Sequence, residues 1–352
     1  MTAHIHAIGT AVPEFDIHRV FIDWAAERLT GRDRAVFIRM AGRSGIDHRF
    51  TVLRRPHPDS TPVDPGGFYG GRMPPTSERM ITYALEAPEL ALKAVADLGN
   101  RTSLDGITHL VVASCTGFIA PGIDQIIARR LGLDGGVERT LVGFMGCYAA
   151  VAALRVAHHI ARSDPDARAL VVTIELCSLH MQDTPEIGSL LAQLQFADGA
   201  AAALVSSRPE GLAIDRFFAA TLPDSDSLIQ WTIGDEGFVM HLSGEVPARI
   251  TQALETPEMR RAILGNRAAA DMPSWAVHAG GRSILDAVEH GLGLGPTPLF
   301  ASRETLRRFG NMSSSTLMFV LAGMMDEPTA VDGIAVAFGP GLAAEGFTIA
   351  SA

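Results

Sequence analysis

The chemistry that this sequence offers begins with a cysteine at the start of a helical pattern. Cys147 lies between the β-rich run 139–142 and the helical pattern 149–161. Free backbone amides and the dipole at a helix start favour negative charge, so this position predicts a thiol pKa lowered toward the nucleophilic thiolate. Gly146 permits a sharp turn into the helix. Cysteine is also among the most buried residue types, so a small buried side chain is the alternative interpretation.

A thiolate needs a base or an ion-pair partner, and His278 is the candidate. It follows the strand-like run 274–277 and precedes Ala279 and two glycines, a pattern typical of a strand end that faces a cleft. A structural histidine with satisfied ring nitrogens is the alternative, because twelve histidines are scattered along the chain. Asn311 stands just before another helical pattern, where an N-cap is the simpler interpretation.

These residues need a scaffold that brings strand ends and helix starts together. Helical patterns occupy residues 87–99, 122–133, 149–161, 248–255, 282–292 and 315–325. Between them lie β-rich runs at residues 108–114, 168–176, 199–207, 274–280, 333–339 and 345–351. This alternation predicts an α/β fold with buried, largely parallel sheets. The layout of the first half returns more loosely in the second, which predicts a boundary near residue 206 and two halves, 1–206 and 207–352.

Composition narrows the classes of function. The chain has 352 residues, of which 47% are hydrophobic and 19% charged, so it can bury a large core. A net charge of -10 argues against a nucleic-acid partner. Neither a signal-peptide pattern nor a long apolar window is present, so we expect a cytoplasmic protein without a membrane partner. The Pro- and Gly-rich stretch 51–79 is typical of a surface excursion.

Three cysteines without a C-x-x-C pair predict reduced thiols and neither a disulfide framework nor a metal site.

The motifs around Cys147, His278 and Asn311 resemble the active site of the type III polyketide synthases, the chalcone-synthase-like branch of the thiolase superfamily. These motifs read GCYAA, HAGG and GNMSS. Five more stretches fall where the family places counterparts: RMAGRSGIDHRF, CTGFIAPG, ELCSLH, QFADGAAA and AFGPGLAAE. The resemblance therefore runs along nearly the whole chain. It implies a thiolase-like fold with αβαβα layers, built from two similar halves.

The resemblance also implies a role for each of the three residues. Cys147 matches the nucleophile that accepts the acyl group, and His278 matches the partner that holds it as a thiolate. Asn311 joins His278 in binding the thioester carbonyl, because an imidazole and an amide NH₂ can stabilise the enolate oxygen that malonyl decarboxylation creates. The implied substrates are an acyl-CoA starter and malonyl-CoA. We expect no metal, no further cofactor and no obligatory acyl carrier protein.

Further positions match the family's cavity. Phe196 matches an aromatic gatekeeper between the cavity and the CoA tunnel, although core packing before a strand is the alternative. The other implied cavity residues are Cys115, Cys177, His180, Trp231, Met240, Phe338 and Gly339.

Several of these positions depart from the plant enzymes. Cys115, Cys177 and His180 stand in place of threonines, Met240 replaces a second gatekeeping phenylalanine, and Trp231 replaces a glycine beside the starter pocket. An indole at that position should exclude a bulky phenylpropanoid starter. The flexible side chain of Met240 favours an aliphatic chain.

The implied CoA site has three residues and one departure. Arg39, Arg43 and Ser283 fall on positions that contact CoA, and guanidinium groups bind phosphates well. Val36 stands where the family carries a further cation, and Arg34 is a candidate substitute. For each arginine, a solvated surface position is the alternative.

Two other functions stay open on the sequence alone. A β-ketoacyl-ACP synthase III has the same fold and triad but performs one condensation onto a carrier protein, and the GNMSS and FGPG contexts favour the polyketide synthase. A non-catalytic acyl-CoA-binding scaffold predicts a lost triad residue, whereas all three are present. For the polyketide synthase, we expect a pyrone or a resorcinol- or phloroglucinol-type product.

The resemblance also implies a homodimer. In such a dimer the loop 118–122 reaches the cavity of the partner, with Ala120 at the position of contact.

Overall fold

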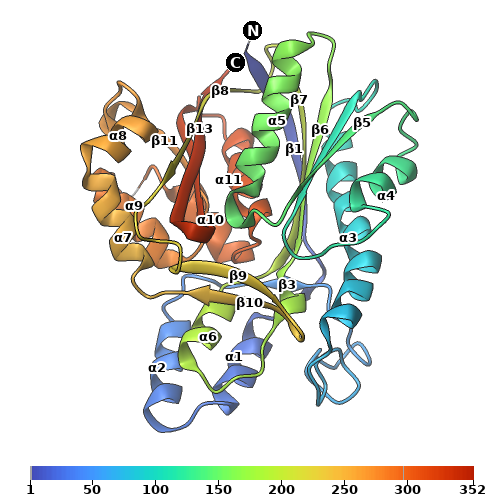
Figure 1. The fold of residues 1–352 in the computed structure, drawn as a ribbon, viewed down its shortest axis with the longest axis vertical. Coiled ribbons are helices and arrows are strands. Elements are labelled where there is room, and N and C mark those ends of the chain that lie inside the picture. Colours follow the sequence, from blue (N-terminus) through green and yellow to red (C-terminus); the bar gives the residue numbers. More distant parts are fainter. Residues whose placement is uncertain (1, 296) are drawn as a thin grey trace.

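The backbone is organised around one nine-stranded sheet. The computed structural model describes residues 2–295 and 297–352 (Figure 1). The order of the strands is β11-β12-β13-β8-β1-β7-β6-β4-β5. Their bounds are β1 (Ala3–Ala11), β4 (His109–Ser114), β5 (Glu138–Gly143), β6 (Ala169–Leu176), β7 (Asp198–Ser206), β8 (Leu212–Thr221), β11 (Ser274–Val277), β12 (Asp332–Gly339) and β13 (Ala343–Ser351). Two small sheets pair β2 (Phe15–Asp16) with β3 (Phe50–Thr51) and β9 (Ile229–Gly234) with β10 (Gly237–Leu242).

The sheet consists of two related halves that meet where β1 pairs antiparallel with β8. The order β4-β6-β7-β1 in the first half returns as β11-β12-β13-β8 in the second, and β5 has no counterpart there. Only the pairs β4–β5, β4–β6 and β11–β12 are parallel, so the prediction of largely parallel sheets is wrong. The reason is visible at Pro340–Leu342, where a single 3₁₀ turn joins β12 to β13; so short a connection permits only an antiparallel pair.

Helices alternate with the two halves of the sheet to give five layers (Figure 1). The outer helices are α3 (Thr76–Gly99) and α4 (Ile123–Arg130) on one side, and α7 (Val246–Glu255), α8 (Pro257–Leu264) and α9 (Arg282–Leu292) on the other. The central layer holds α5 (Ala149–Ser163) and α11 (Ser314–Asp326), which α10 (Phe300–Phe309) precedes. At the lower end, beneath β9 and β10, lie α1 (His18–Glu27), α2 (Gly31–Ala41) and α6 (Ile187–Gln193). The predicted αβαβα architecture is confirmed.

The helices of the central layer are buried and closely packed. Every residue of α11 from Ser314 to Ala322 is buried, and α5 buries the run 149–154. The alanines 200–203 of β7 are fully buried, and such small side chains let helices approach the sheet. Because the middle of this layer is buried, the candidate catalytic groups lie at the ends of its helices.

The stretch 51–79 is only partly the surface excursion that its composition predicts. Phe68 and Tyr69 are buried in the core of the first half, and the Tyr69 hydroxyl donates a hydrogen bond to the Ser178 carbonyl at 2.9 Å. The last residues of the stretch form the first turn of α3, which starts at Thr76. Aromatic anchors thus fix a Pro- and Gly-rich segment onto the fold.

Candidate active site

Cys147 lies where a one-turn 3₁₀ helix, Gly146–Tyr148, leads from β5 into the central helix α5. Gly146 has φ +74°, and a Cβ atom there would collide with the ring of Pro340, so glycine is required at this turn. The hydroxyl of Ser313 donates to the Cys147 Sγ at 3.9 Å. The cysteine therefore sits between the starts of the two central helices, α5 and α11.

The ionisation of Cys147 differs from the prediction. Burial raises the pKa of its thiol to about 12, and the nearby Glu175 carboxyl acts in the same direction, whereas the hydrogen bond from Ser313 lowers it. Removing a thiolate from water outweighs the favourable position at a helix start. The prediction of a lowered thiol pKa is thus wrong for the free enzyme, in which Cys147 is a neutral thiol at neutral pH.

His278 directly follows β11, and its backbone N–H donates to the Val336 carbonyl at 2.8 Å. The residue is 1% exposed, and neither ring nitrogen has a hydrogen-bond partner among the described residues. Burial lowers the pKa of this imidazole to about 3, so the ring is neutral. The His278 ring is therefore not held by structural hydrogen bonds. One ring nitrogen of the neutral imidazole can accept a proton, and the N–H of the other can donate to an oxygen.

Asn311 lies in the loop between α10 and α11 and is held on both sides. Its backbone N–H donates to the Gln195 carbonyl at 2.8 Å, and its carbonyl accepts from the Ala197 N–H at 2.9 Å. Its side-chain Oδ1 accepts from the Ser313 N–H at 2.9 Å, and Nδ2 donates to the Gly280 carbonyl at 3.1 Å. The side chain therefore orders the start of α11 and still carries one further N–H on Nδ2.

These contacts bring the three predicted residues to one place. Ser313 connects the loop of Asn311 to Cys147, and Asn311 connects the same loop to Gly280. A Cβ atom on Gly280 would lie 3.6 Å from His278 Nε2, so Gly280 packs against that ring. No hydrogen bond joins Cys147 to His278 within the described residues.

A pocket opens over Cys147. Five of the predicted cavity residues line it: Cys115, Cys177, Phe196, Trp231 and Met240. The site is thus a small, mostly apolar chamber around one sulfur.

The remaining predicted cavity residues lie outside this pocket. A Cβ atom on Gly339 would collide with the Tyr148 ring and lie 3.4 Å from the Cys147 backbone nitrogen, so Gly339 shapes the turn behind the cysteine. Phe338 is buried in the core of the second half. His180 lines an adjoining pocket.

The hairpin of β9 and β10 supplies one wall, where Trp231 and Met240 are cross-strand partners. The Trp231 Nε1–H donates to the Cys115 carbonyl at 3.0 Å, and its ring meets the His180 ring edge-on at 5.3 Å. His180 Nε2–H donates to the Thr116 carbonyl at 2.8 Å, and its Nδ1 accepts from the Phe238 N–H at 3.0 Å. Both nitrogens of His180 are therefore used, and this residue is part of a rigid wall.

The predicted CoA-binding residues lie on the surface near the start of α9. Arg39, Arg43 and Ser283 are exposed, and Arg282 Nη1 donates to the Arg43 carbonyl at 3.3 Å, so the start of α9 lies beside Arg43. None of the three predicted residues lines the pocket over Cys147.

The helical geometry of α2 does not favour Arg34 as the substitute cation. With 3.6 residues per turn, Arg39 shares a face of α2 with Val36, whereas Arg34 lies on the opposite face. Arg32, four residues before Val36, lies on the same face as Val36 and Arg39.

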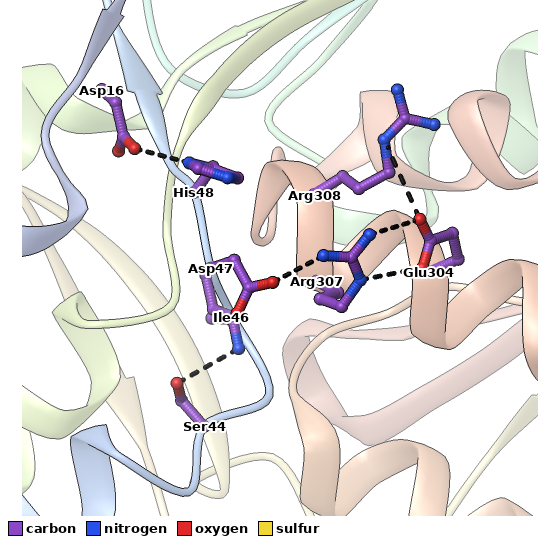
Figure 2. A network of polar contacts seen from close by, with 8 residues as sticks. All are labelled: Asp16, Ser44, Ile46, Asp47, His48, Glu304, Arg307 and Arg308. Atoms are coloured by element: carbon purple, nitrogen blue, oxygen red, sulfur yellow. Dashed lines mark hydrogen bonds and ion pairs between the residues drawn. The ribbon is translucent and has the colours of Figure 1, made fainter.

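A network of ion pairs fixes the segment between α2 and β3 onto α10 (Figure 2). The backbone N–H groups of Asp47 and His48 donate to the Arg307 carbonyl, and Arg307 Nη1 also meets Asp47 Oδ2 at 2.6 Å. Glu304 pairs with the same guanidinium, and His48 pairs with Asp16 at 2.8 Å. Since α10 leads into Asn311, the network joins the segment after Arg43 to the loop of the candidate site.

Sequence reasoning missed Glu175, although it begins the motif ELCSLH. This buried carboxyl accepts hydrogen bonds from the Cys115 N–H at 3.0 Å and the Thr116 hydroxyl at 2.8 Å. It also accepts from the Ser314 hydroxyl at 2.5 Å, and burial raises its pKa to about 7. Ser313 was a second residue that the sequence analysis did not identify. Its place close to Asn311 in the GNMSS motif was the available signal.

Two kinds of feature are absent from the part of the chain that the structure describes. Residues 2–295 and 297–352 contain no cluster of three His, Cys, Asp or Glu side chains that could hold a metal ion. No helix in these ranges is long and apolar enough to cross a bilayer.

Known proteins share both the sequence and the fold. Residues 2–209 match the family described as "Chalcone and stilbene synthases, N-terminal domain", and residues 215–352 match its C-terminal domain. The "Alpha-pyrone synthesis polyketide synthase-like Pks18" of Mycobacterium tuberculosis is 34% identical over 74% of this chain and 68% of its own length.

Two solved structures superpose on nearly the whole fold. The C-terminal type III polyketide synthase domain of Steely1 from Dictyostelium is 26% identical, with a TM-score of 0.88 over 100% of this chain and 99% of that one. PKS-I from the brown alga Ectocarpus siliculosus is 27% identical, with a TM-score of 0.86 over 100% and 98%. With both halves matched, the chain belongs to the chalcone and stilbene synthase family and is a type III polyketide synthase, an acyltransferase.

Proposed function

We propose that Cys147 accepts the acyl group of an acyl-CoA starter, and that malonyl-CoA then extends it by repeated decarboxylative condensation. Two observations support this proposal. Half-buried Cys147 lies beneath a pocket, and contacts through the Asn311 loop and Gly280 connect it to an imidazole whose nitrogens have no partner among the described residues. In the loading step, Cys147 Sγ attacks the thioester carbon and the bond to the CoA sulfur breaks. His278 takes the thiol proton and passes it to the departing CoA sulfur, so charges and protons balance.

The extension step uses the same groups in a different way. The bond between the malonyl carboxylate and its α-carbon breaks, CO₂ leaves, and the electron pair forms an enolate. A ring N–H of His278 and the remaining N–H of Asn311 Nδ2 donate to the enolate oxygen. The enolate carbon attacks the acyl-Cys147 carbonyl, and Cys147 leaves as a thiolate that carries the charge of the lost carboxylate. For the next round this thiolate attacks the thioester carbon of the lengthened acyl-CoA, and CoA leaves as a thiolate. The apolar ring of Phe196, at the pocket wall, would favour loss of the charged carboxylate as neutral CO₂.

The pocket favours an aliphatic starter. Trp231 occupies one wall and is fixed by its hydrogen bond to Cys115, which leaves little room for an aromatic ring. For the product, we propose an α-pyrone in preference to a resorcinol- or phloroglucinol-type ring, because the mycobacterial relative is named for α-pyrone synthesis. No acyl carrier protein takes part in this scheme.

The CoA moiety is assigned to the exposed residues beside α9. Arg39, Arg43 and Ser283 would bind it, and Arg32 takes the place of Arg34 as the further cation because it shares the face of Val36.

We also propose a homodimer. β5 is the free edge of the sheet, and its Leu141 is 45% exposed, as is Phe118 at 43% in the loop that carries Ala120. An unpaired strand with apolar side chains is a surface for a second copy. Sedimentation should give a dimer, and Leu141→Arg should weaken it; an active monomer at all concentrations would contradict the proposal.

A reducing compartment, the cytoplasm, suits the three unpaired cysteines of the chain.

The experiment that tests the function is incubation of the enzyme with malonyl-CoA and a panel of acyl-CoAs, without carrier protein. We expect polyketide products by mass spectrometry, with aliphatic starters used better than phenylpropanoyl-CoA. A requirement for acyl carrier protein, or release of only a singly extended product, would contradict the proposal.

A further inference from the structure

A second pocket adjoins the one over Cys147. It shares four lining residues with the first pocket: Cys177, Phe196, Trp231 and Met240. Its far side is formed by residues at the start and within the first turn of α1 and by α6, which lie together beneath β9 and β10 (Figure 1). We name it the Arg49 chamber, because Arg49 is the charged residue that lines it.

The walls of the Arg49 chamber are largely apolar. Ile17, Phe21 and Met181 are buried there, and the shared side chains of Phe196, Trp231 and Met240 are half-buried. Burial lowers the pKa of His180 to about 3, so this wall residue adds no charge. No carboxylate is among the lining residues. The chamber is therefore suited to methylene groups, with one positive charge at its edge.

Arg49 has hydrogen-bonding capacity that the protein leaves unused. The residue is 2% exposed, and its Nη1 donates to the carbonyls of Gln193 at 3.0 Å and Phe196 at 2.8 Å. Its Nε donates to His18 Nδ1 at 3.0 Å. Nη2 has no partner among the described residues.

Within residues 2–295 and 297–352, no carboxylate pairs with this guanidinium directly. Asp16 and Asp198 act on it only through space, since Asp16 is bonded to His48 and Asp198 to Ser178. Burial lowers the pKa of Arg49 to about 9, so it remains charged at neutral pH. A buried cation without a paired anion is costly, and an anion that enters the chamber would relieve that cost.

We propose that the Arg49 chamber binds the far end of the starter acyl chain, and that Arg49 Nη2 favours chains that end in a carboxylate over alkyl chains of equal length. This inference rests on the proposed loading of the starter onto Cys147. The apolar walls receive the methylene groups, and a charged guanidinium is a strong donor to a carboxylate.

Met240 provides the passage between the two pockets. It borders both, and its side chain has three rotatable bonds, whereas Trp231 beside it is fixed by its hydrogen bond. An extended chain can therefore displace Met240 and run from Cys147 into the Arg49 chamber.

The first test compares two starters of six carbons, hexanoyl-CoA and adipoyl-CoA, which differ in the terminal carboxylate. We expect the KM of the wild-type enzyme for adipoyl-CoA to be about tenfold lower, as for one hydrogen bond to a charged group. In Cys147→Ala, where no loading occurs, calorimetry should give the same ratio of dissociation constants. Equal values for the two starters, or a preference for hexanoyl-CoA, would overturn the proposal.

Two variants locate the effect. Arg49→Gln should remove the preference by weakening only adipoyl-CoA binding. Because Arg49 also holds two backbone carbonyls, Ser189→Trp provides an independent test: it fills the chamber from α6 and should weaken both six-carbon starters but not acetyl-CoA. Glu186→Trp is the matched control, because Glu186 is exposed at the start of α6 and lies outside the chamber lining; it should behave as wild type. Unchanged use of both long starters by Ser189→Trp would show that the chain lies elsewhere.

Acetyl-CoA separates this inference from the proposed function. Polyketide formation from acetyl-CoA without any preference between the six-carbon starters contradicts the role of Arg49 alone. Absence of polyketide from every starter contradicts the proposed function, and the binding ratio in Cys147→Ala then still decides the chamber.

Discussion

The two halves of the molecule carry different chemical groups of the candidate site. The first half supplies one sulfur, Cys147, from the turn before α5, and its pKa is raised by burial. The second half supplies a neutral imidazole at the end of β11 and an amide before α11, His278 and Asn311. In the proposed reaction, the bond-forming atom and the groups that stabilise charge are carried by separate halves. Substitutions in the two halves should therefore separate the steps of the reaction.

The largest effect should come from breaking the first half alone. Cys147→Ala is expected to abolish condensation, because no acyl-enzyme forms, while malonyl-CoA decarboxylation persists within roughly tenfold of wild type since His278 and Asn311 remain. Product analysis and release of labelled CO₂ measure the two steps. Full polyketide output from this variant would contradict the assignment.

Breaking the second half should remove both steps. In His278→Ala, decarboxylation and condensation should each fall by roughly 10²–10³-fold, the usual cost of losing one donor to a developing oxyanion. The same two assays apply, with circular dichroism to show that the variant is folded. Loss of condensation with normal decarboxylation would mean that the enolate is stabilised elsewhere.

The reactivity of the Cys147 thiol in the free enzyme should depend strongly on pH. With a thiol pKa of about 12, the reactive thiolate is scarce at neutral pH in the free enzyme. The rate of Cys147 alkylation by iodoacetamide should therefore be slow at pH 7 and rise about tenfold per pH unit up to pH 10. A rate that reaches a plateau below pH 8 would indicate an ion pair with His278 in the resting state.

The motifs allowed the layered fold to be predicted, because it depends on short stretches of sequence with fixed spacing. The joint catalytic role of Cys147, His278 and Asn311 stays a prediction. The ionisation of Cys147 was mispredicted, because it depends on burial and on the charge of the Glu175 carboxyl, which comes from β6. Strand direction was mispredicted for a similar reason. The short 3₁₀ turn at Pro340–Leu342 makes β12 and β13 antiparallel, but the spacing of hydrophobic residues does not indicate such a turn.

The wall between the pockets could be predicted only in part. The identity of Trp231 indicated a filled starter pocket, but its position between two chambers depends on the pairing of β9 with β10 and on the hydrogen bond to Cys115. Arg49 lies within a motif, yet its free Nη2 is apparent only from the partners of the other nitrogens.

A fourth prediction concerns that wall. Trp231→Gly should merge the two pockets and admit aromatic starters or further extensions. The lost packing should destabilise the fold by about 3 kcal/mol, the low end for a tryptophan because Trp231 is partly exposed. Mass spectrometry of products and the melting temperature test both effects. A folded variant with an unchanged starter range and product length would show that Trp231 is ordinary packing.

The smallest effect should come from the buried carboxyl that joins the two halves. Glu175 accepts from Cys115 of the first half and Ser314 of the second, and its pKa is raised to about 7. The native state therefore holds this proton more tightly than the unfolded state. The contribution of Glu175 to the stability of the fold is greatest below about pH 4.5 and is lost as pH rises through 7.

In Glu175→Gln, the decrease in the free energy of unfolding with rising pH should be smaller by about 2–3 kcal/mol than in the wild type. Denaturation at several pH values measures this decrease. Asp198, with a pKa raised to about 6, should account for the slope that remains. An identical pH slope in the variant and the wild type would contradict the raised pKa of Glu175.

The burial of α11 on all sides has a consequence for biosynthesis. This helix packs against α5, β6 and β7, but the ribosome makes residues 314–326 long after those elements. At about 5–20 residues per second, the apolar face that α11 covers stays in water for several seconds after β7 emerges. The exposed apolar face of the nascent first half is therefore a binding site for chaperones that hold unfolded chains. A ribosome that pauses before codon 314 would expose a surface prone to aggregation.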